Sequence, residues 1–368
     1  MEYSFYVPIN VLHVITTIDR GGAENQLLLL VEEQIKLGVN VQVAYLKGNA
    51  ELFNEFEAIG AKIINLAVYK DFINQILGLR RVLKQLPKNS VIHAHLPQAE
   101  LLCVLSKYRQ NIFIITRHFG GRFKPSSNLF LSSLLGKIAS SRSNRVIAIS
   151  TSVKNILIEN REVCDESKIE VIKYGFNKEK FKSEIANLKN GELTLPIRIG
   201  TISRLSPEKN VNLIIEAYAE LRKVLVLDKL QIIGVGPLEK ELKKLSVNLG
   251  IGNEVQFLGK TKNVAQFIND LDVFVLASSF EGFGMVLLEA MSIGKRIVGS
   301  RNSAILEIIG DTKCGILFET GDKSALVDAI IKSTETRFEE IAEAQEIKLL
   351  EYEITDTAKR IMSLYQSI

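Results

Sequence analysis

The sequence is poor in cysteine and has no hydrophobic run long enough to cross a membrane. Its 368 residues include three cysteines, Cys103, Cys164 and Cys314, which form no Cys-x-x-Cys pair. An odd, scattered set argues against a disulfide scaffold or a zinc–thiolate site and is typical of a reducing compartment. No apolar run approaches the roughly 18 residues that span a bilayer, and the first 19 residues lack the lysine or arginine of a signal peptide. We therefore expect a cytoplasmic globular protein.

Acidic residues are absent from residues 101–158, which carry nine lysines and arginines. Residues 1–185 hold 24 basic and 17 acidic residues, a balance of +7, and the rest of the chain holds 22 and 25, a balance of −3. The net charge of +4 therefore hides an asymmetry. A cationic field suggests an anionic partner, which is a nucleic acid, a membrane surface or a phosphorylated substrate. The alternative is a solvated face that happens to lack acids.

Short apolar runs alternate with helical patterns along the chain, which predicts mainly parallel sheets with helices on both faces. The polar segment 178–195 is expected to be a linker, because the same pattern restarts after it. We predict two Rossmann-like, doubly wound α/β domains, 1–177 and 196–350, facing across a cleft, and a C-terminal helix within 351–368 that can cross back to the first domain. Strands are expected at Val11–Thr17, Val39–Leu46, Lys62–Leu66, Val91–His95, Ile112–Thr116, Arg145–Ile149, Ile169–Tyr174, Ile197–Ile202, Leu230–Gly234, Val255–Leu258, Val273–Ala277 and Arg296–Gly299.

Two cations stand at a strand–helix junction in the second half. Arg204 and Lys209 lie in GTISRLSPEKN, between an apolar strand and an amphipathic helix. An arginine fork and a lysine point charge beside a helix amino terminus suit a diphosphate. The alternative is a pair of exposed surface cations.

A glycine turn follows the next strand, in IIGVGP. Gly234 and Gly236 allow the backbone to approach a ligand. The segment lacks the third glycine and the acidic residue of a dinucleotide-binding fingerprint, so the sequence does not support a dehydrogenase.

Two glutamates flank a glycine-rich corner in SSFEGFGMVLLEAMSIGKR, residues 278–296. Glu281 follows an apolar strand, a helix is expected to begin near Met285, and Glu289 lies just over one turn into it. A carboxylate accepts hydrogen bonds from sugar hydroxyls, and the helix amino terminus between the two glutamates can bind a phosphate. This segment therefore favours a nucleotide or a sugar as the ligand.

Five such segments occur in the order in which retaining glycosyltransferases with the GT-B fold carry them. The spacing of Glu281 and Glu289 is similar to the E-x7-E motif of these enzymes, and the surrounding residues resemble glycosyltransferase family 4 of the bacterial envelope polysaccharide type. Arg204 and Lys209 resemble the phosphate clamp of that family. The other matching segments are IIGVGP at 232–237, VQFLG at 255–259 and GGAE at 21–24.

The resemblance implies roles for individual residues. Arg204 and Lys209 would stabilise the nucleotide diphosphate as leaving group. Glu289 would bind the ribose hydroxyls, and Glu281 would contact the donor sugar. Backbone groups would complete the donor site, and they belong to Gly22, Gly234, Gly236, Phe283, Gly284, Met285 and Val286.

The four histidines of the first half are expected to differ in role. The resemblance places His118 where it can hydrogen-bond the donor sugar, and His95 and Arg117 are expected on the acceptor side. His93 and His13 are predicted to be structural. Zinc binding by His93, His95 and His118 is the alternative. It is disfavoured because such glycosyltransferases resemble one another in needing no bound metal, and because no Asp-x-Asp motif appears.

The chain departs from the family pattern near the donor site. Arg296 replaces a frequent proline, Asn302 and Ser303 replace a Gly-Gly pair ahead of Glu307, and Val235 replaces an acidic residue. These changes leave the clamp and both glutamates in place.

The function implied is transfer of a hexose or N-acetylhexosamine, with retention, from a nucleotide diphosphate sugar to a saccharide hydroxyl in surface polysaccharide synthesis. We favour a UDP-sugar donor, a polyprenyl- or lipid-linked acceptor and a place at the inner face of the cytoplasmic membrane, where residues 101–158 would meet anionic lipid. No essential metal or other cofactor is expected. The rivals are a nucleotide-sugar 2-epimerase of the same architecture and a nucleic-acid-binding protein, for which no RNA-reading motif is found.

Overall fold

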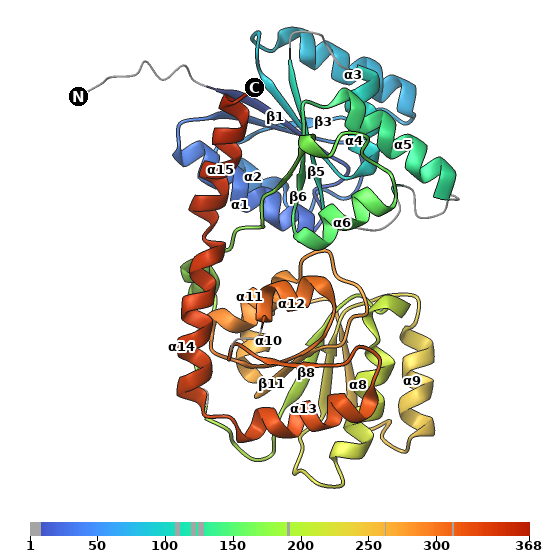
Figure 1. Ribbon diagram of the computed structural model, residues 1–368, viewed down its shortest axis with the longest axis vertical. Helices are drawn as coiled ribbons and strands as arrows, with labels where there is room; N and C mark the ends of the chain where they lie inside the picture. Colours follow the sequence, from blue (N-terminus) through green and yellow to red (C-terminus); the bar gives the residue numbers. More distant parts are fainter. Residues whose placement is uncertain are drawn as a thin grey trace, which may run out of the picture. The chain divides into compact units, whose positions relative to one another are not determined.

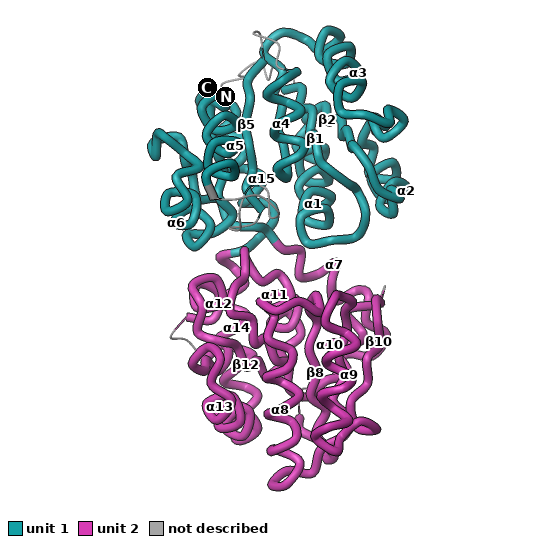
Figure 2. The backbone as a smooth tube through the Cα atoms, turned by 90° about the vertical axis from the view of Figure 1, so that its right-hand side faces the viewer, with its two compact units in different colours: residues 1–175, 352–368 teal, residues 176–351 magenta. Residues whose placement is uncertain are grey.

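The computed structural model describes residues 9–106, 111–118, 123, 129–189, 192–261, 263–310 and 313–368. The chain divides into two compact units (Figure 2). Unit 1 consists of residues 1–175 and 352–368, and unit 2 consists of residues 176–351. Each unit is a parallel sheet with helices on both of its faces (Figure 1), which confirms the predicted fold class.

Unit 1 contains a seven-stranded parallel sheet in the order β3-β2-β1-β4-β5-β6-β7. Its strands are β1 (Asn10–Ile15), β2 (Asn40–Tyr45), β3 (Lys62–Asn65), β4 (Val91–His95), β5 (Ile112–Arg117), β6 (Arg145–Ala148) and β7 (Ile169–Val171). Its helices are α1 (Gly22–Lys36), α2 (Phe53–Ala58), α3 (Phe72–Gln85), α4 (Pro97–Ser106), α5 (Leu129–Arg142), α6 (Thr151–Glu159), the 3-10 helix η1 (Glu166–Lys168) and α15 (Ile354–Gln366).

The alternation of side chains along β1 builds one core on each face of this sheet. Val11 and Ile15 pack into a cluster with α1, α2 and α15. Leu12 and Val14 point the other way, into a cluster with α3 and α4. Strands buried on both faces are expected to read as continuous apolar runs, as β1 does.

Unit 2 contains a six-stranded parallel sheet in the order β10-β9-β8-β11-β12-β13. Its strands are β8 (Ile199–Ile202), β9 (Leu230–Ile233), β10 (Val255–Gly259), β11 (Val273–Leu276), β12 (Arg296–Ser300) and β13 (Ile316–Phe318). Its helices are α7 (Lys178–Ser183), the 3-10 helix η2 (Pro207–Lys209), α8 (Val211–Leu221), α9 (Glu239–Asn248), α10 (Val264–Asp270), α11 (Met285–Ser292), α12 (Ser303–Ile309), α13 (Lys323–Glu335) and α14 (Phe338–Leu349), and the 3-10 helix η3 (Leu350–Tyr352) ends where unit 1 resumes.

The structure differs from the expected organisation in the segment 178–195. It begins with helix α7, because the Asn177 side chain accepts a hydrogen bond from Lys180 N and caps the first turn. Helix α7 packs on α11 and belongs to unit 2. The C-terminal helix α15 packs on α1 in unit 1. Within the described ranges, no helix has both the length and the apolar character needed to cross a bilayer.

Candidate functional site

Three loops meet at the carboxyl edge of the unit 2 sheet. Strand β8 lies between β9 and β11. After β8 the chain forms β9 and β10 on one side of it, and then crosses over to form β11, β12 and β13 on the other side. In open α/β sheets, such a reversal of strand order opens a crevice at the carboxyl ends, where ligands bind. The three loops are those after β8, β9 and β11, and they hold the predicted cations, the glycine turn and Glu281.

An ion pair joins two residues that are 72 positions apart in the sequence. Lys209 Nζ donates to Glu281 Oε1 at 2.6 Å, and Ser278 Oγ donates to the same oxygen at 2.8 Å. The two loops are also tied by their backbones, because Ser279 N donates to Glu208 O at 2.8 Å. The pair retains 17% and 13% of its side-chain exposure, so a ligand can reach it.

The glycine turn packs directly against the loop that carries Arg204. Gly234 has φ +138°, and a Cβ there would lie 1.8 Å from the carbonyl oxygen of Ser203. A Cβ at Gly236 would lie 2.3 Å from the carbonyl oxygen of Leu205. Arg204 itself is exposed, and it has no ion-pair partner within the part of the chain that the structure describes. Its guanidinium is therefore available to an anion.

Helix α11 begins next to this ion pair. Gly284, with φ +96°, precedes its first residue, Met285, and Phe283 is buried. The amino terminus of α11 presents unpaired N–H groups, which favour an anion. Burial, and then the charge of Glu184, raises the pKa of Glu289 to about 7.

Asn302 holds the loop after β11 from the side. Its Oδ1 accepts hydrogen bonds from Ala304 N and Ile305 N and so caps α12, and its Nδ2 donates to the carbonyl oxygen of Ser278 at 2.7 Å. Ser300 Oγ donates to the same carbonyl at 2.5 Å. Because Ser278 also donates to Glu281, Asn302 helps to position that carboxylate.

In unit 1, the glycine loop after β1 leads into α1. A Cβ at Gly22 would meet no atom within 4 Å, so packing inside the unit does not require this glycine. Asp19 anchors the loop by accepting a hydrogen bond from Asn49 N at 2.7 Å. An open backbone at a helix start is compatible with the approach of a phosphate.

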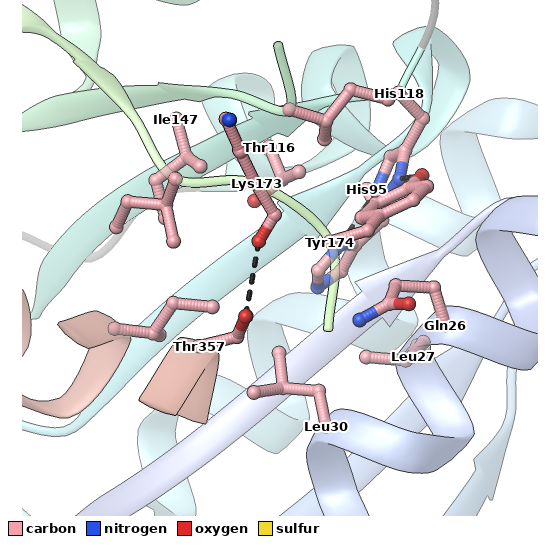
Figure 3. Close-up of a pocket in the computed structure, with 13 residues that line it drawn as sticks. Gln26, Leu27, Leu30, His95, Thr116, His118, Ile147, Lys173, Tyr174 and Thr357 are labelled. Atoms are coloured by element: carbon pink, nitrogen blue, oxygen red, sulfur yellow. Dashed lines mark hydrogen bonds between the residues drawn. The ribbon is translucent and has the colours of Figure 1, made fainter. Parts of the chain in front are cut away.

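The four histidines of the chain form one cluster along β1 and β4 and at the end of β5, in which His13, His93 and His95 are buried and His118 is part-buried. Figure 3 shows His95 and His118 beside Tyr174 at one side of a small pocket, with Gln26 and Leu27 of α1 near them. Burial lowers the pKa of His13 to about 4 and that of His118 to about 3, so the imidazoles are neutral at pH 7.

The histidines that approach one another as metal ligands do are His13, His93 and His95, whose nitrogens lie within 4.8 Å. This set differs from the expected zinc alternative, because His13 takes the place of His118. Each ring nitrogen of the three already has a protein partner, as the structural role predicted for His13 and His93 requires.

Arg117, expected on the acceptor side, is buried in unit 1. Its Nε lies 2.9 Å from Glu100 Oε2, and its Nη1 donates to Glu162 Oε2 at 2.7 Å. Its guanidinium also lies over the Phe123 ring, 4.5 Å from the centroid. Burial raises the pKa of Glu100 to about 7, although Arg117 opposes this shift. The charge of Arg117 is thus compensated inside unit 1 by Glu100 and Glu162, and its expected place on the acceptor side stays a prediction.

The cationic stretch 101–158 is described only in part. Helix α5 is described, and so is Phe123, which is buried. The remaining expected members of the stretch, Lys107, Arg109, Phe119, Arg122 and Lys124, lie outside the described residues.

Sequence reasoning missed Ser278, Asn302, Gln34, Tyr174 and Tyr365 as contributors to these clusters. The signal for Asn302 was present, because it stands where the family often has glycine. The tyrosines and Gln34 carry no local signal, since their partners are far away in the sequence.

Two family models match consecutive parts of the chain. The model of Glycosyltransferase Family 4 matches residues 20–180, and that of Glycosyl transferases group 1 matches residues 182–347. The N-acetyl-alpha-D-glucosaminyl L-malate synthase of Bacillus anthracis is 32% identical over 251 residues, 66% of this chain and 64% of that protein. A Campylobacter jejuni enzyme, N-acetylgalactosamine-N,N'-diacetylbacillosaminyl-diphospho-undecaprenol 4-alpha-N-acetylgalactosaminyltransferase, is 33% identical over 131 residues, 35% of each chain. The chain thus spans less than two thirds of the length of these curated relatives.

Solved structures share the fold over nearly the whole chain. Anabaena Alr3699/HepE in complex with UDP has a TM-score of 0.80 and 19% identity, with 98% of this chain and 100% of that chain covered. Such an identity supports the fold alone. Together with the two family models, it confirms the resemblance drawn from the motifs: the chain belongs to the family 4 glycosyltransferases and has the GT-B fold.

Proposed function

We propose that this protein is a retaining glycosyltransferase that moves a hexose or N-acetylhexosamine from a nucleotide diphosphate sugar to a hydroxyl of a lipid-linked saccharide. The observation that carries the proposal is the Lys209–Glu281 pair beside the exposed Arg204, at the point where the strand order of unit 2 reverses. UDP is the favoured nucleotide, because Anabaena Alr3699/HepE was crystallised with UDP and with UDP-glucose.

The chemistry follows from where negative charge grows during the reaction. As the sugar leaves, charge accumulates on the diphosphate, and Arg204 and Lys209 stabilise it there. Glu281 contacts the sugar and Glu289 the ribose hydroxyls. No side chain is assigned as a covalent nucleophile, so the acceptor attacks on the face that the diphosphate leaves, and a phosphate oxygen takes its proton. His118 and His95 belong to the sugar and acceptor side of the proposal.

Replacement of the cations tests the donor site. Lys209→Ala and Arg204→Ala should each lower turnover on the order of 10²-fold or more, because each removes charge stabilisation. Lys223→Ala, an exposed lysine near the opposite end of α8, is the matched control and should leave turnover unchanged. Near-normal rates in both site variants would overturn the proposal.

The donor is identified by a thermal-shift panel of UDP-, GDP- and ADP-sugars. A donor at a hundredfold excess over its Kd should stabilise the folded chain by about 2.7 kcal/mol. Turnover should persist in EDTA, since the proposal assigns no metal. Loss of activity in EDTA and its recovery with a divalent cation would contradict that part.

A nucleotide-sugar 2-epimerase of the same architecture is the second candidate, and it is not favoured, because the matching family models are those of glycosyltransferases. Such an enzyme converts a single nucleotide sugar and needs no acceptor. Incubation with the donor alone separates the two, since a transferase should release product only after a saccharide acceptor is added. An epimerised sugar without acceptor would support the second candidate.

The proposed lipid-linked acceptor implies contact with a membrane surface, and a face of α5 supports this. Phe130 is 78% exposed, and Leu134 and Ile138 follow it at helical spacing, also exposed. A surface hollow places Lys137 and Arg161 beside Phe130 and Leu134. Apolar side chains next to cations are what an interfacial helix needs, at about 1 kcal/mol per cation near anionic lipid.

Flotation with anionic liposomes tests this contact. The double variant Phe130→Ser/Leu134→Ser should float less than the unaltered protein. Val247→Ser, which removes a 68% exposed residue from α9, is the control and should float normally. If the unaltered protein does not associate with the liposomes at low salt, the proposed membrane contact is refuted.

A further inference from the structure

The histidine cluster is a continuous chain of hydrogen bonds that starts at Gln34 of α1. Gln34 Oε1 lies 2.8 Å from His13 Nε2, and His13 Nδ1 lies 2.9 Å from His95 Nε2. His95 Nδ1 lies 2.9 Å from His118 Nε2, and His118 Nδ1 bonds the hydroxyl of Tyr174. The chain thus runs from the interior of α1 to the carboxyl end of β5.

Each neutral imidazole has one donor nitrogen and one acceptor nitrogen, so the first bond fixes all the others. Gln34 Oε1 only accepts, and His13 must therefore donate from Nε2 and accept at Nδ1. His95 then donates from Nε2 to His13, and His118 donates from Nε2 to His95. Nδ1 of His118 is left as an acceptor, and the Tyr174 hydroxyl donates to it.

A second arm starts at the same amide. Gln34 Nε2 donates to Tyr365 Oη at 3.3 Å. The Tyr365 hydroxyl then donates to His93 Nδ1 at 2.6 Å, and His93 donates from Nε2 to Thr116 Oγ1 at 2.6 Å. The two ends of one amide thus set the direction of both arms, and all four imidazoles carry their proton on Nε2.

We propose that Gln34 is the positioning residue that holds all four histidines as Nε2–H tautomers, and that it thereby makes Nδ1 of His118 the acceptor for a hydroxyl of the substrate. The inference rests on the proposed function in one respect, the contact of His118 with the sugar. In that contact, a sugar hydroxyl takes the place of the Tyr174 hydroxyl.

Burial explains why one amide can control so many groups. Gln34, His13 and His93 have no exposed surface, and His95 has 2%. Turning the amide by half a rotation reverses every bond in both arms, which is the only other consistent arrangement. In the arm of three histidines, a mixed arrangement places two N–H groups or two lone pairs face to face. In the other arm, reversing His93 alone leaves the Tyr365 hydroxyl proton without an acceptor. Either fault leaves a buried polar group without a partner, which costs about 1–3 kcal/mol. The network is therefore all-or-none.

The tautomers are measured by 15N NMR of the full-length protein labelled in histidine, with no substrate present. The unaltered protein should show four rings protonated at Nε2 and not at Nδ1. Gln34→Met, which keeps a similar volume without the amide, should remove the uniform pattern. Gln26→Met, a 5% exposed glutamine of the same helix that bonds no histidine, is the matched control and should keep it. An Nδ1–H ring in the unaltered protein, or an unchanged pattern in Gln34→Met, would overturn the inference.

Gln34→Glu provides a variant with a definite opposite effect. A carboxylate accepts from both His13 and Tyr365, so Tyr365 no longer donates to His93, and the buried negative charge holds an extra proton on the chain. With Tyr365 donating to the carboxylate, His93 should either donate from Nδ1 to Tyr365 Oη or carry both protons, so its pure Nε2–H signal should be lost at pH 7. Four rings that all stay in the Nε2–H form, while the 13C shift of the introduced carboxyl shows it ionised, would also contradict the inference.

Addition of the nucleotide sugar identified by thermal shift tests the acceptor role of His118. In Tyr174→Phe, Nδ1 of His118 should give the signal of a free lone pair, and bound sugar should shift it to that of a hydrogen-bonded one. Binding without such a shift would refute the acceptor role and leave the proposed function standing. If the tautomer pattern is as expected but the protein transfers no sugar, only the proposed function is refuted.

Discussion

At the scale of single residues, Gly234 is the position where the backbone of the donor site leaves least room. It combines φ +138° with a site at which a Cβ would overlap the carbonyl oxygen of Ser203. Gly250, with φ +71°, has no atom within 4 Å of its would-be Cβ. The two glycines therefore separate the cost of the dihedral from the cost of contact.

We expect Gly234→Ala to lower the free energy of unfolding by about 3 kcal/mol, and Gly250→Ala to lower it by about 1 kcal/mol. Only Gly234→Ala should also weaken UDP binding, because the loop with Arg204 must move. Chemical denaturation and calorimetric titration measure the two effects. Equal losses in the two variants would mean that the contact with Ser203 is relieved without displacement.

Glu289 makes stability depend on pH. Its folded pKa of about 7 lies above the ordinary value of 4.5, so the folded chain disfavours the ionised form. The stability that the protonated group provides is complete below pH 4.5 and is lost as the pH rises through about 7.

Glu289→Gln should therefore match the unaltered protein at pH 5 and exceed it at pH 8, by on the order of 1–2 kcal/mol in the free energy of unfolding. Denaturant titrations at several pH values measure this difference. Glu241→Gln, an exposed glutamate of α9, should give a difference that does not vary with pH. A constant difference for Glu289→Gln would show that the carboxyl is ionised in the fold at little cost.

Some residues of the site could be predicted from sequence and others could not. The Lys209–Glu281 pair was expected at one ligand, because each follows a strand and parallel strands bring their carboxyl ends to one edge. Arg117 also ends a strand, but its partners Glu100 and Glu162 come from other elements. A count of charges along 101–158 contains no information on acids that arrive from outside that range.

At the scale of elements, α12 is fixed by a residue that does two things. Asn302 caps the helix with its oxygen and holds Ser278 with its nitrogen. Aspartate keeps the cap and loses the donor, whereas glycine loses both contacts and is tolerated at an N-cap at a cost of only a few tenths of a kcal/mol.

Asn302→Asp should lower turnover of a UDP-sugar several-fold, because the loop of Ser278 and Glu281 loses a hydrogen bond that positions it. The free energy of unfolding should fall by less than about 1 kcal/mol, because the helix cap is kept. Asn302→Gly should lower turnover by a similar factor. Steady-state kinetics and thermal melts provide the comparison. Unchanged turnover in both variants would show that Ser300 alone suffices to hold Ser278.

The strands were more predictable than the short elements. The twelve expected strands occur within three residues of their predicted bounds, since each is a buried apolar run. Strand β13 was missed because its three residues are too short for a pattern. Helix α7 was missed because its only buried residue is Phe181, so that its sequence appears as polar as a linker.

At the scale of the whole molecule, the two units have separate cores, and a ligand of unit 2 should stabilise that unit directly. The sequence has no tryptophan, so a single introduced one reports on one unit. Phe53 in unit 1 and Phe267 in unit 2 are partly exposed and accept the larger ring.

In urea, the fluorescence midpoint of Phe267→Trp should rise on addition of saturating UDP by more than that of Phe53→Trp. The expected stabilisation is about 2.7 kcal/mol at a hundredfold excess over the Kd. The reference for each variant is the same urea titration without UDP. Equal shifts in the two variants would show that the chain unfolds as a single cooperative body.

Helix α15 has a consequence for how the protein is made. Its residues Ala358, Ile361, Met362, Leu364 and Tyr365 are buried in a core of the unit that the first residues of the chain begin. During synthesis, unit 1 can be completed only after α15 has been made. All of unit 2, residues 176–351, is synthesised before that, at a time when the core of unit 1 still lacks α15. Domains commonly mature in the order of their synthesis. We therefore expect the unit that emerges first to be completed last and to stay accessible to chaperones and proteases for longer.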